Sequence, residues 1–181
     1  MARIKLPVVS ELTAEQQQQY ARFPANLTLG LLKTSRSAQG YLSLGASFPA
    51  GRLCDKDREM IILRVGALSH SAYERMQHYP LAILAGWRDD DIEKIEQGVG
   101  IDARGTAILH FVDECVKQVK VSADTFNAVR RYYDEVQLAE LALMIGHYID
   151  DGALFGNAGN RSGPTSDILG KHVNGLNTRT A

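Results

Sequence analysis

The sequence predicts an all-α protein, and three observations favour this fold class. First, apolar residues recur along the chain with a spacing of about 3.6 residues, the period of an amphipathic helix. Second, capping signals such as Thr13-Ala14-Glu15-Gln16 and Ser71-Ala72-Tyr73-Glu74 stand at the start of apolar segments. Third, no segment shows the polar–apolar alternation of a half-buried strand. We therefore expect helices that pack on helices.

The N-terminal part of the chain predicts three helices before a clear break. Residues 1–12 are expected to be extended, since Pro7 interrupts regular structure. Helices are expected at about 13–22, 26–32 and 35–48. A Pro-Ala-Gly sequence at 49–51 then separates them from the centre of the chain.

Residues 55–86 predict two helices that fold back on each other, and we expect this hairpin to organise the rest of the chain. After its acidic start, the first helix, at 55–68, is interrupted only by Arg58, Glu59 and Arg64. A helix that is apolar around most of its circumference is usually buried in a core or under a partner subunit. One of its first aspartates is expected to cap it.

The second helix of the hairpin is expected to begin at Ser71 and to end at Gly86. Ser71, Glu74 and His78 are spaced i, i+3 and i+7 and therefore lie along one face. At about 1.5 Å per residue from the turn, Glu59 and His78 reach nearly the same height. A carboxylate and an imidazole at one level of an apolar helix pair favour proton transfer, so we predict an acid–base site there.

The remainder of the chain predicts further helices and a glycine-rich tail. Helices are expected at about 89–97, 102–119, 122–133 and 137–155. The tail, 156–181, is expected either to be partly disordered or to wrap a neighbouring subunit. The whole chain, 1–181, is expected to form one domain with its core at about 13–155.

Composition and charge limit the function classes. The 181 residues are 45% hydrophobic, enough for a full core, and the net charge of −1 gives no reason to expect nucleic acid as a partner. No apolar run approaches the roughly 20 residues of a membrane span, and residues 1–12, which lack a long apolar stretch, are not expected to be a secretory signal. The two isolated thiols, Cys54 and Cys115, suit a reducing compartment, so we expect a cytoplasmic protein that binds no membrane.

The hairpin also resembles a known family. The residues that carry the resemblance are Arg58, Glu59, Arg64, Ser71, Tyr73, Glu74 and His78. Their pattern, over about 53–98, is similar to that of the carboxymuconolactone decarboxylase and alkyl hydroperoxidase D (AhpD) family. The resemblance implies an AhpD-like helical bundle built around a central antiparallel helix hairpin. It also implies a homo-oligomer, a trimer or hexamer, because family members bury helix faces between subunits.

The sequence departs from the redox branch of this family at two positions. In that branch two cysteines precede the histidine by seven and four positions, where this chain has Ser71 and Glu74. Without that pair the site has no dithiol to reduce a peroxide. The sequence therefore looks more like the non-redox branch, whose reaction is decarboxylation and double-bond movement in a lactone acid, with no cofactor.

These observations predict catalytic roles for Glu59 and His78. His78 would move a proton and Glu59 would orient it or relay the proton, on a small cyclic or lactone acid. Neither His78 nor His70 belongs to a metal-binding motif, so no metal is expected. Two alternatives stay open: a thiol peroxidase that uses Cys54 or Cys115, and a ligand-binding protein without catalysis.

Five further residues are candidates for substrate binding: Arg64, Ser71, Tyr73, Glu74 and His147. A guanidinium suits a substrate carboxylate by its bidentate geometry, but Arg64 could equally form a structural ion pair. Ser71 and Glu74 could act only as a helix cap. Tyr73 and His147 could simply be core residues.

Overall fold

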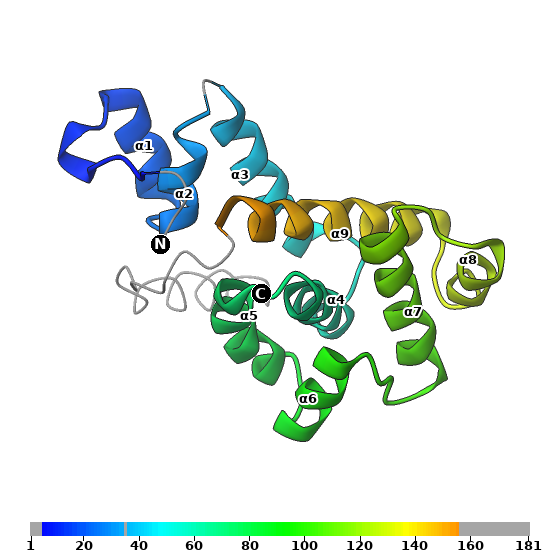
Figure 1. Ribbon diagram of the computed structural model, residues 1–181. Helices are drawn as coiled ribbons and strands as arrows, with labels where there is room; N and C mark the ends of the chain where they lie inside the picture. The colour runs from blue at the N-terminus through cyan, green and yellow to red at the C-terminus, as the bar shows by residue number, and fades with distance from the viewer. Residues whose placement is uncertain (1–4, 35, 156–181) are drawn as a thin grey trace, which may run out of the picture.

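The computed structural model describes residues 5–34 and 36–155, and regular structure in these ranges is entirely helical (Figure 1). The helices of these ranges are α1 (Ala14–Arg22), α2 (Asn26–Leu31), α3 (Ser37–Ser47), α4 (Asp55–Leu68), α5 (Ala72–Leu84), α6 (Asp89–Gln97), α7 (Ala103–Gln118), α8 (Ala123–Val129) and α9 (Glu135–Phe155), with short 3-10 turns η1 (Val9–Glu11) and η2 (Phe48–Ala50). The predicted all-α fold is confirmed. The tail 156–181 lies outside the described residues.

Helix α4 is the centre of the main core and forms the expected antiparallel hairpin with α5. It lies in the middle of Figure 1, surrounded by α5, α6, α7 and α9, and it contacts all four. Ile61, Ile62 and Val65 on α4 have no exposed surface. Burial of each such side chain contributes about 1.5–3 kcal/mol, which explains why this helix is apolar on nearly every side.

The hairpin turn is tight because a glycine and a serine lie where the two helices meet. A Cβ on Gly66 would lie 3.0 Å from Cβ of Glu74, so a larger residue there would push α4 and α5 apart by a few tenths of an ångström. The hydroxyl of Ser71 accepts from the amide of Glu74 at 3.3 Å and caps α5, as predicted. Gly86, with φ of 95°, follows the end of α5 in the left-handed conformation that the sequence predicted.

The expected aspartate cap of α4 is wrong. The N-cap residue is Cys54, whose side chain makes no capping hydrogen bond, and the aspartates lie in the first helical turn. Their carboxylates are engaged elsewhere: Asp55 pairs with Arg58, and Asp57 accepts from Tyr133 at 2.6 Å. Both carboxylates therefore bind other side chains and do not cap the N-terminus of α4.

Helix α9 joins the two parts of the core. Helices α1–α3 pack around a separate apolar cluster that includes Leu27 and Leu31, and α9 runs from the main core to these helices (Figure 1). The carboxylate of Glu140 on α9 accepts from the backbone amides of Arg52 and Leu53, at 2.7 and 3.2 Å, which fixes the chain entering α4. In the described part of the chain, no helix combines the length and the apolarity needed to cross a membrane.

Candidate functional site

His78 on α5 and Glu59 on α4 meet inside the hairpin. Nδ1 of His78 lies 2.7 Å from Oε2 of Glu59, which confirms the predicted contact. The side chains are 14% and 3% exposed, respectively, so water reaches the imidazole but hardly reaches the carboxylate. In the tautomer in which Nδ1 of His78 carries the hydrogen, Nδ1 donates to Glu59, and Nε2 faces Glu74.

The charges around His78 favour its protonated form. Burial disfavours the imidazolium, but the hydrogen bond to Glu59 and the negative charges of Glu59 and Glu74 outweigh it, so the pKa of His78 is raised above 6.5. The positive charge of Arg58 acts in the opposite direction. Because its pKa is raised, the imidazole of His78 accepts a proton more readily than the imidazole of an exposed histidine does.

Glu74 brings a second carboxylate to the same imidazole. Its Oε2 lies 3.7 Å from Nε2 of His78, one turn of α5 away, and the residue is almost completely buried. Arg58 donates to the other oxygen of Glu59 at 3.3 Å, so Glu59 is held by two donors. His78 therefore lies between two carboxylates, one bonded to Nδ1 and one facing Nε2.

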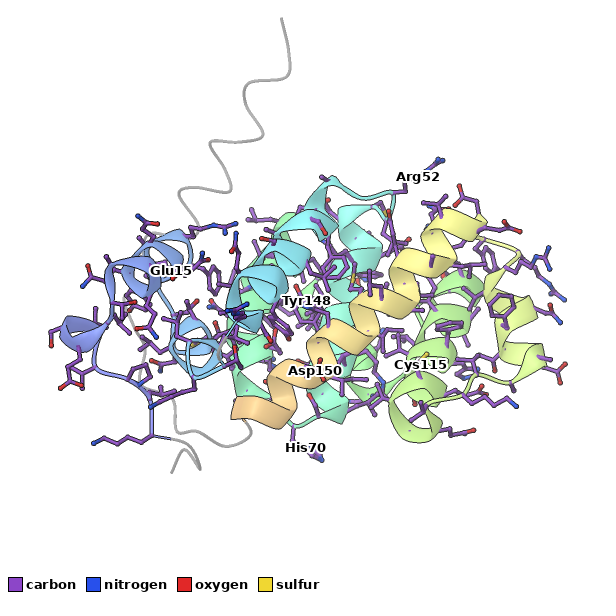
Figure 2. All side chains as sticks on the ribbon, turned by 90° about the horizontal axis from the view of Figure 1, so that it is seen from above. Glu15, Arg52, His70, Cys115, Tyr148 and Asp150 are labelled. Atoms are coloured by element: carbon purple, nitrogen blue, oxygen red, sulfur yellow. The ribbon has the colours of Figure 1, made fainter. Side chains whose placement is uncertain are left out.

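Aromatic rings from distant parts of the chain complete the surroundings of His78. The ring of Tyr148 lies edge-on to His78 at 5.2 Å and edge-on to His147 at 5.3 Å, and Tyr148 lies within the packed side chains in Figure 2. Tyr41 stacks on His147 at 4.2 Å, and Phe48 meets the same imidazole at 5.3 Å. We call Tyr41, Phe48, His147 and Tyr148 the aromatic wall.

His147 is a buried, neutral imidazole within this wall. It is 8% exposed, and its Nδ1 is buried without a hydrogen-bond partner among the described residues. Burial lowers the pKa of His147 to about 4, and the charge of Asp150 opposes this only in part. The ring is therefore uncharged at neutral pH. His147 could be predicted from the sequence, whereas no sequence pattern points to Tyr41 or Phe48, which lie about a hundred residues earlier.

Arg64 is not placed to anchor a substrate. Its Nε and Nη2 donate to both oxygens of Asp113 at 2.6 and 2.8 Å, and its Nη1 donates to the carbonyl of Glu96 at 2.6 Å. Burial opposes ionisation of Asp113, but hydrogen bonds from Arg64 and Lys117 outweigh it and lower the pKa of the carboxyl group. Arg64 therefore forms a structural ion pair, which was the alternative that the sequence left open, and the predicted role as a substrate anchor is corrected. Nothing in the sequence pointed to Asp113 as its partner.

Ser71 and Tyr73 lie in other surroundings. Ser71 caps α5 and lines an open cavity of about 260 Å³ at the hairpin turn, beside His70 and Arg75. Figure 2 shows His70 at the periphery of the molecule. Tyr73 packs against the N-terminal apolar cluster, and its hydroxyl accepts from Gln77 at 3.1 Å. Of the predicted site residues, the structure thus brings Glu59, His78 and Glu74 into one cluster, with His147 reached through Tyr148.

Thiols and metal ligands do not gather at this cluster. Cys54 is exposed at the start of α4, and Cys115 lies on α7. Burial, helped by the charge of Glu114, raises the pKa of Cys115 to about 11, so this sulfur stays protonated at neutral pH. Within residues 5–34 and 36–155, no group of three His, Cys, Asp or Glu side chains is arranged to hold a metal ion.

Comparison with known proteins bears on the fold. No protein-family model matches the sequence, and no curated protein matches it. Among solved structures, a peroxidase-related protein from Ralstonia eutropha JMP134, described as an alkylhydroperoxidase AhpD core, superposes with a TM-score of 0.69 at 16% identity, over 84% of this chain and 87% of that chain. A protein from Agrobacterium tumefaciens, proposed to be the antioxidant defence protein AhpD, superposes with a TM-score of 0.65 at 14% identity, over 72% of this chain and 94% of that chain. The chain therefore has the all-α fold of AhpD-like proteins.

Proposed function

We propose that this protein is a cofactor-free acid–base enzyme that isomerises or decarboxylates a small cyclic or lactone compound. The observation that carries the proposal is the buried contact of 2.7 Å between Nδ1 of His78 and Oε2 of Glu59, with Glu74 on the other side of the ring. A histidine that one carboxylate orients at Nδ1, with a second carboxylate 3.7 Å from Nε2 to stabilise the protonated ring, is an arrangement that supports a general base.

In the proposed reaction His78 moves one proton. Neutral His78 takes a proton from the carbon next to the carbonyl through Nε2, and the electron pair of that C–H bond moves into the carbonyl to form an enolate. Glu59 and Glu74 stabilise the resulting imidazolium. His78 then returns the proton to a different carbon, and the double bond has moved. In decarboxylation the C–C bond to the carboxyl group breaks, carbon dioxide leaves, and the imidazolium protonates the remaining carbon.

The test is an assay of lactones and lactone acids in deuterated water, followed by proton NMR. We expect wild-type protein to incorporate deuterium at the carbon that the imidazolium of His78 protonates. His78→Ala should lower the rate by about 10²–10⁴-fold, because proton transfer by a positioned side chain contributes that much. Glu59→Gln should also slow the reaction, since it keeps the shape and removes the charge that stabilises the imidazolium.

The matched control is His70→Ala, which removes an exposed histidine at the hairpin turn and should leave the rate unchanged. Equal rates for wild type, His78→Ala and Glu59→Gln would remove the proposed roles.

A thiol peroxidase is the second candidate, and the descriptions of the structural neighbours favour it. Such an activity would have to use Cys54 or Cys115, since Ser71 and Glu74 stand where the redox pair would be. Loss of hydroperoxide turnover in Cys54→Ser would support this candidate. No turnover in the wild type would end it, and binding of a lactone without conversion would favour a non-catalytic ligand-binding protein.

A further inference from the structure

Arg58 makes a contact that helix geometry does not favour. Neighbouring residues of a helix point in directions about 100° apart, so their side chains do not face each other. Nε of Arg58 nevertheless donates to Oε1 of Glu59, the next residue on α4, at 3.3 Å. Nη1 of the same guanidinium donates to Oδ1 of Asp55, one turn earlier, at 3.0 Å. Because a guanidinium is planar and rigid, the two contacts together fix its orientation.

This pair of contacts leads from the surface of the protein to the buried carboxylate of the site. The side chain of Asp55 is largely exposed, that of Arg58 is mostly buried, and that of Glu59 is almost completely buried. Solvent would therefore hardly replace a donor that Glu59 lost. Within the described residues, Oε1 of Glu59 faces Arg58 and Oε2 faces His78. Since both oxygens belong to one flat carboxylate, the partner of Oε1 also determines where Oε2 points.

The groups that face His78 come from three helices. Arg58 and Glu59 lie on α4, Glu74 lies on α5, and Tyr148 on α9 brings its ring edge-on at 5.2 Å. Burial has the largest effect on the pKa of His78 and lowers it, whereas the hydrogen bond to Glu59 and the charges of Glu59 and Glu74 raise it. The charge of Arg58 lowers this pKa, with a smaller effect than the hydrogen bond to Glu59. Arg58 can thus influence His78 in two opposite ways, directly by its charge and through Glu59 by geometry.

We propose that Arg58 is a positioning residue, which holds Oε1 of Glu59 so that Oε2 stays at Nδ1 of His78 and Nε2 is the nitrogen that transfers the proton. Asp55 in turn holds the guanidinium of Arg58 from the surface. The inference rests on the proposed function for its effect on catalysis. The placing of Glu59 stands apart from that function and can be measured without a substrate.

Two neutral variants of Arg58 separate its position from its charge. The side-chain nitrogen of glutamine is bonded to Cδ, as Nε of arginine is, so Arg58→Gln keeps a donor near Oε1 of Glu59 and removes the charge. Arg58→Met provides neither the donor nor the charge. Both variants lose the contact to Asp55 and both residues are good helix formers, so the pair differs chiefly in the donor to Glu59. Circular dichroism and thermal unfolding verify that each variant folds.

The readout is the titration of His78, followed by NMR in protein that carries ¹⁵N-labelled histidine. Arg58→Gln loses the positive charge but keeps Glu59 in place, so the pKa of His78 should rise relative to wild type. In Arg58→Met the hydrogen bond from Glu59 to His78 is lost as well. Because that bond outweighs the charge of Arg58, the pKa of His78 should fall. The ¹⁵N signals of His70, which lies beyond the other end of α4, should not change in either variant.

The two variants should also differ in the rate of the proposed reaction. We expect Arg58→Met to lower kcat for deuterium incorporation about tenfold, the effect of one lost hydrogen bond in the transition state, with little change in KM. Arg58→Gln should lower kcat less, because it still holds Glu59.

A fall in the pKa of His78 in Arg58→Met that Arg58→Gln does not share supports the inference. A rise or no change in Arg58→Met would overturn it, because Arg58 would then act by its charge alone or not at all. An equal fall in both variants would also overturn it, since the donor at Nε would not be what holds Glu59. The expected titrations without deuterium incorporation in the wild type would overturn the proposed function and leave the inference standing, so the two failures are distinguishable.

Discussion

At the scale of single residues, His147 should make the protein sensitive to acid. Its pKa is about 4 in the folded protein and 6.5 in the unfolded chain, so the unfolded chain binds more protons between these values. Stability should therefore fall as pH drops from 6.5 toward 4, by at most about 1.4 kcal/mol per pH unit from this residue. Urea unfolding of wild type and His147→Phe across this range isolates the effect, because the carboxylates titrate in both proteins.

His78 should act in the opposite sense. Its folded pKa lies above 6.5, so the stability from its pairing with Glu59 is fully present below pH 6.5 and is lost as pH rises through the folded pKa. We expect the stability difference between wild type and His78→Asn to shrink as pH is raised from 6 to 9. A difference that grows over this range would contradict the raised pKa.

Arg64 should matter for folding rather than for substrate affinity. Arg64→Met removes the bidentate donor of the partly buried Asp113, which keeps only Lys117, and also removes the donor to the Glu96 carbonyl. We expect a loss of about 2–4 kcal/mol in the free energy of unfolding. The matched control is Arg75→Met, which removes an ion pair to Glu96 from a side chain that is 52% exposed and should cost about 0–1 kcal/mol. A raised KM in Arg64→Met at unchanged stability would restore the anchoring role.

At the scale of helices, the two glycines that follow α5 and α6 should respond differently to substitution. Gly86 and Gly98 both have positive φ, 95° and 82°, so alanine is strained at either position by about 1 kcal/mol. At Gly98 the added Cβ would also lie 2.7 Å from Nη2 of Arg64, whereas at Gly86 it meets nothing within 4 Å. Gly98→Ala should therefore lower the thermal midpoint clearly more than Gly86→Ala. Equal shifts would mean that the Arg64–Asp113 pair adjusts freely.

The sequence predicted well the helix starts that depend only on residues a few positions away in the chain. Thr13, Ser71, Asp102 and Ser122 each cap the helix that follows, because a cap needs only an amide two or three residues away. Residues 9–11 form a 3-10 turn instead of extended chain, and the helix expected at 122–133 ends at Val129. These differences are at boundaries, where local signals are weakest.

Long-range partners account for what the sequence left undecided at the site. Helix geometry predicted that Glu59 and His78 lie at the same level along the two paired helices, since both residues belong to one hairpin. The pairing of Arg64 with Asp113 and the gathering of Tyr41, Phe48 and His147 depend on how α7, α3 and α9 pack, which no local pattern encodes.

At the scale of the whole molecule, the predicted homo-oligomer remains to be tested. Val136 and Leu143 on α9 are about half exposed, and Leu84 on α5 is 68% exposed, so apolar surface is present on two helices. Burial of such surface between subunits would contribute about 25 cal/mol per Å². We expect sedimentation velocity to show a trimer or hexamer and Leu143→Glu or Leu84→Glu to dissociate it. A monomer in the wild type at micromolar concentration would contradict the expectation.

The two halves of the site have different origins in the chain. Glu59 and His78 are nineteen residues apart, whereas Tyr41 and His147 are 106 apart and come from helices that flank the hairpin. Substitutions in α3 and α9 can therefore change which ligand binds while the hairpin keeps Glu59 and His78 in place. Variants selected for new ligands should accumulate changes in these outer helices and leave 55–86 untouched.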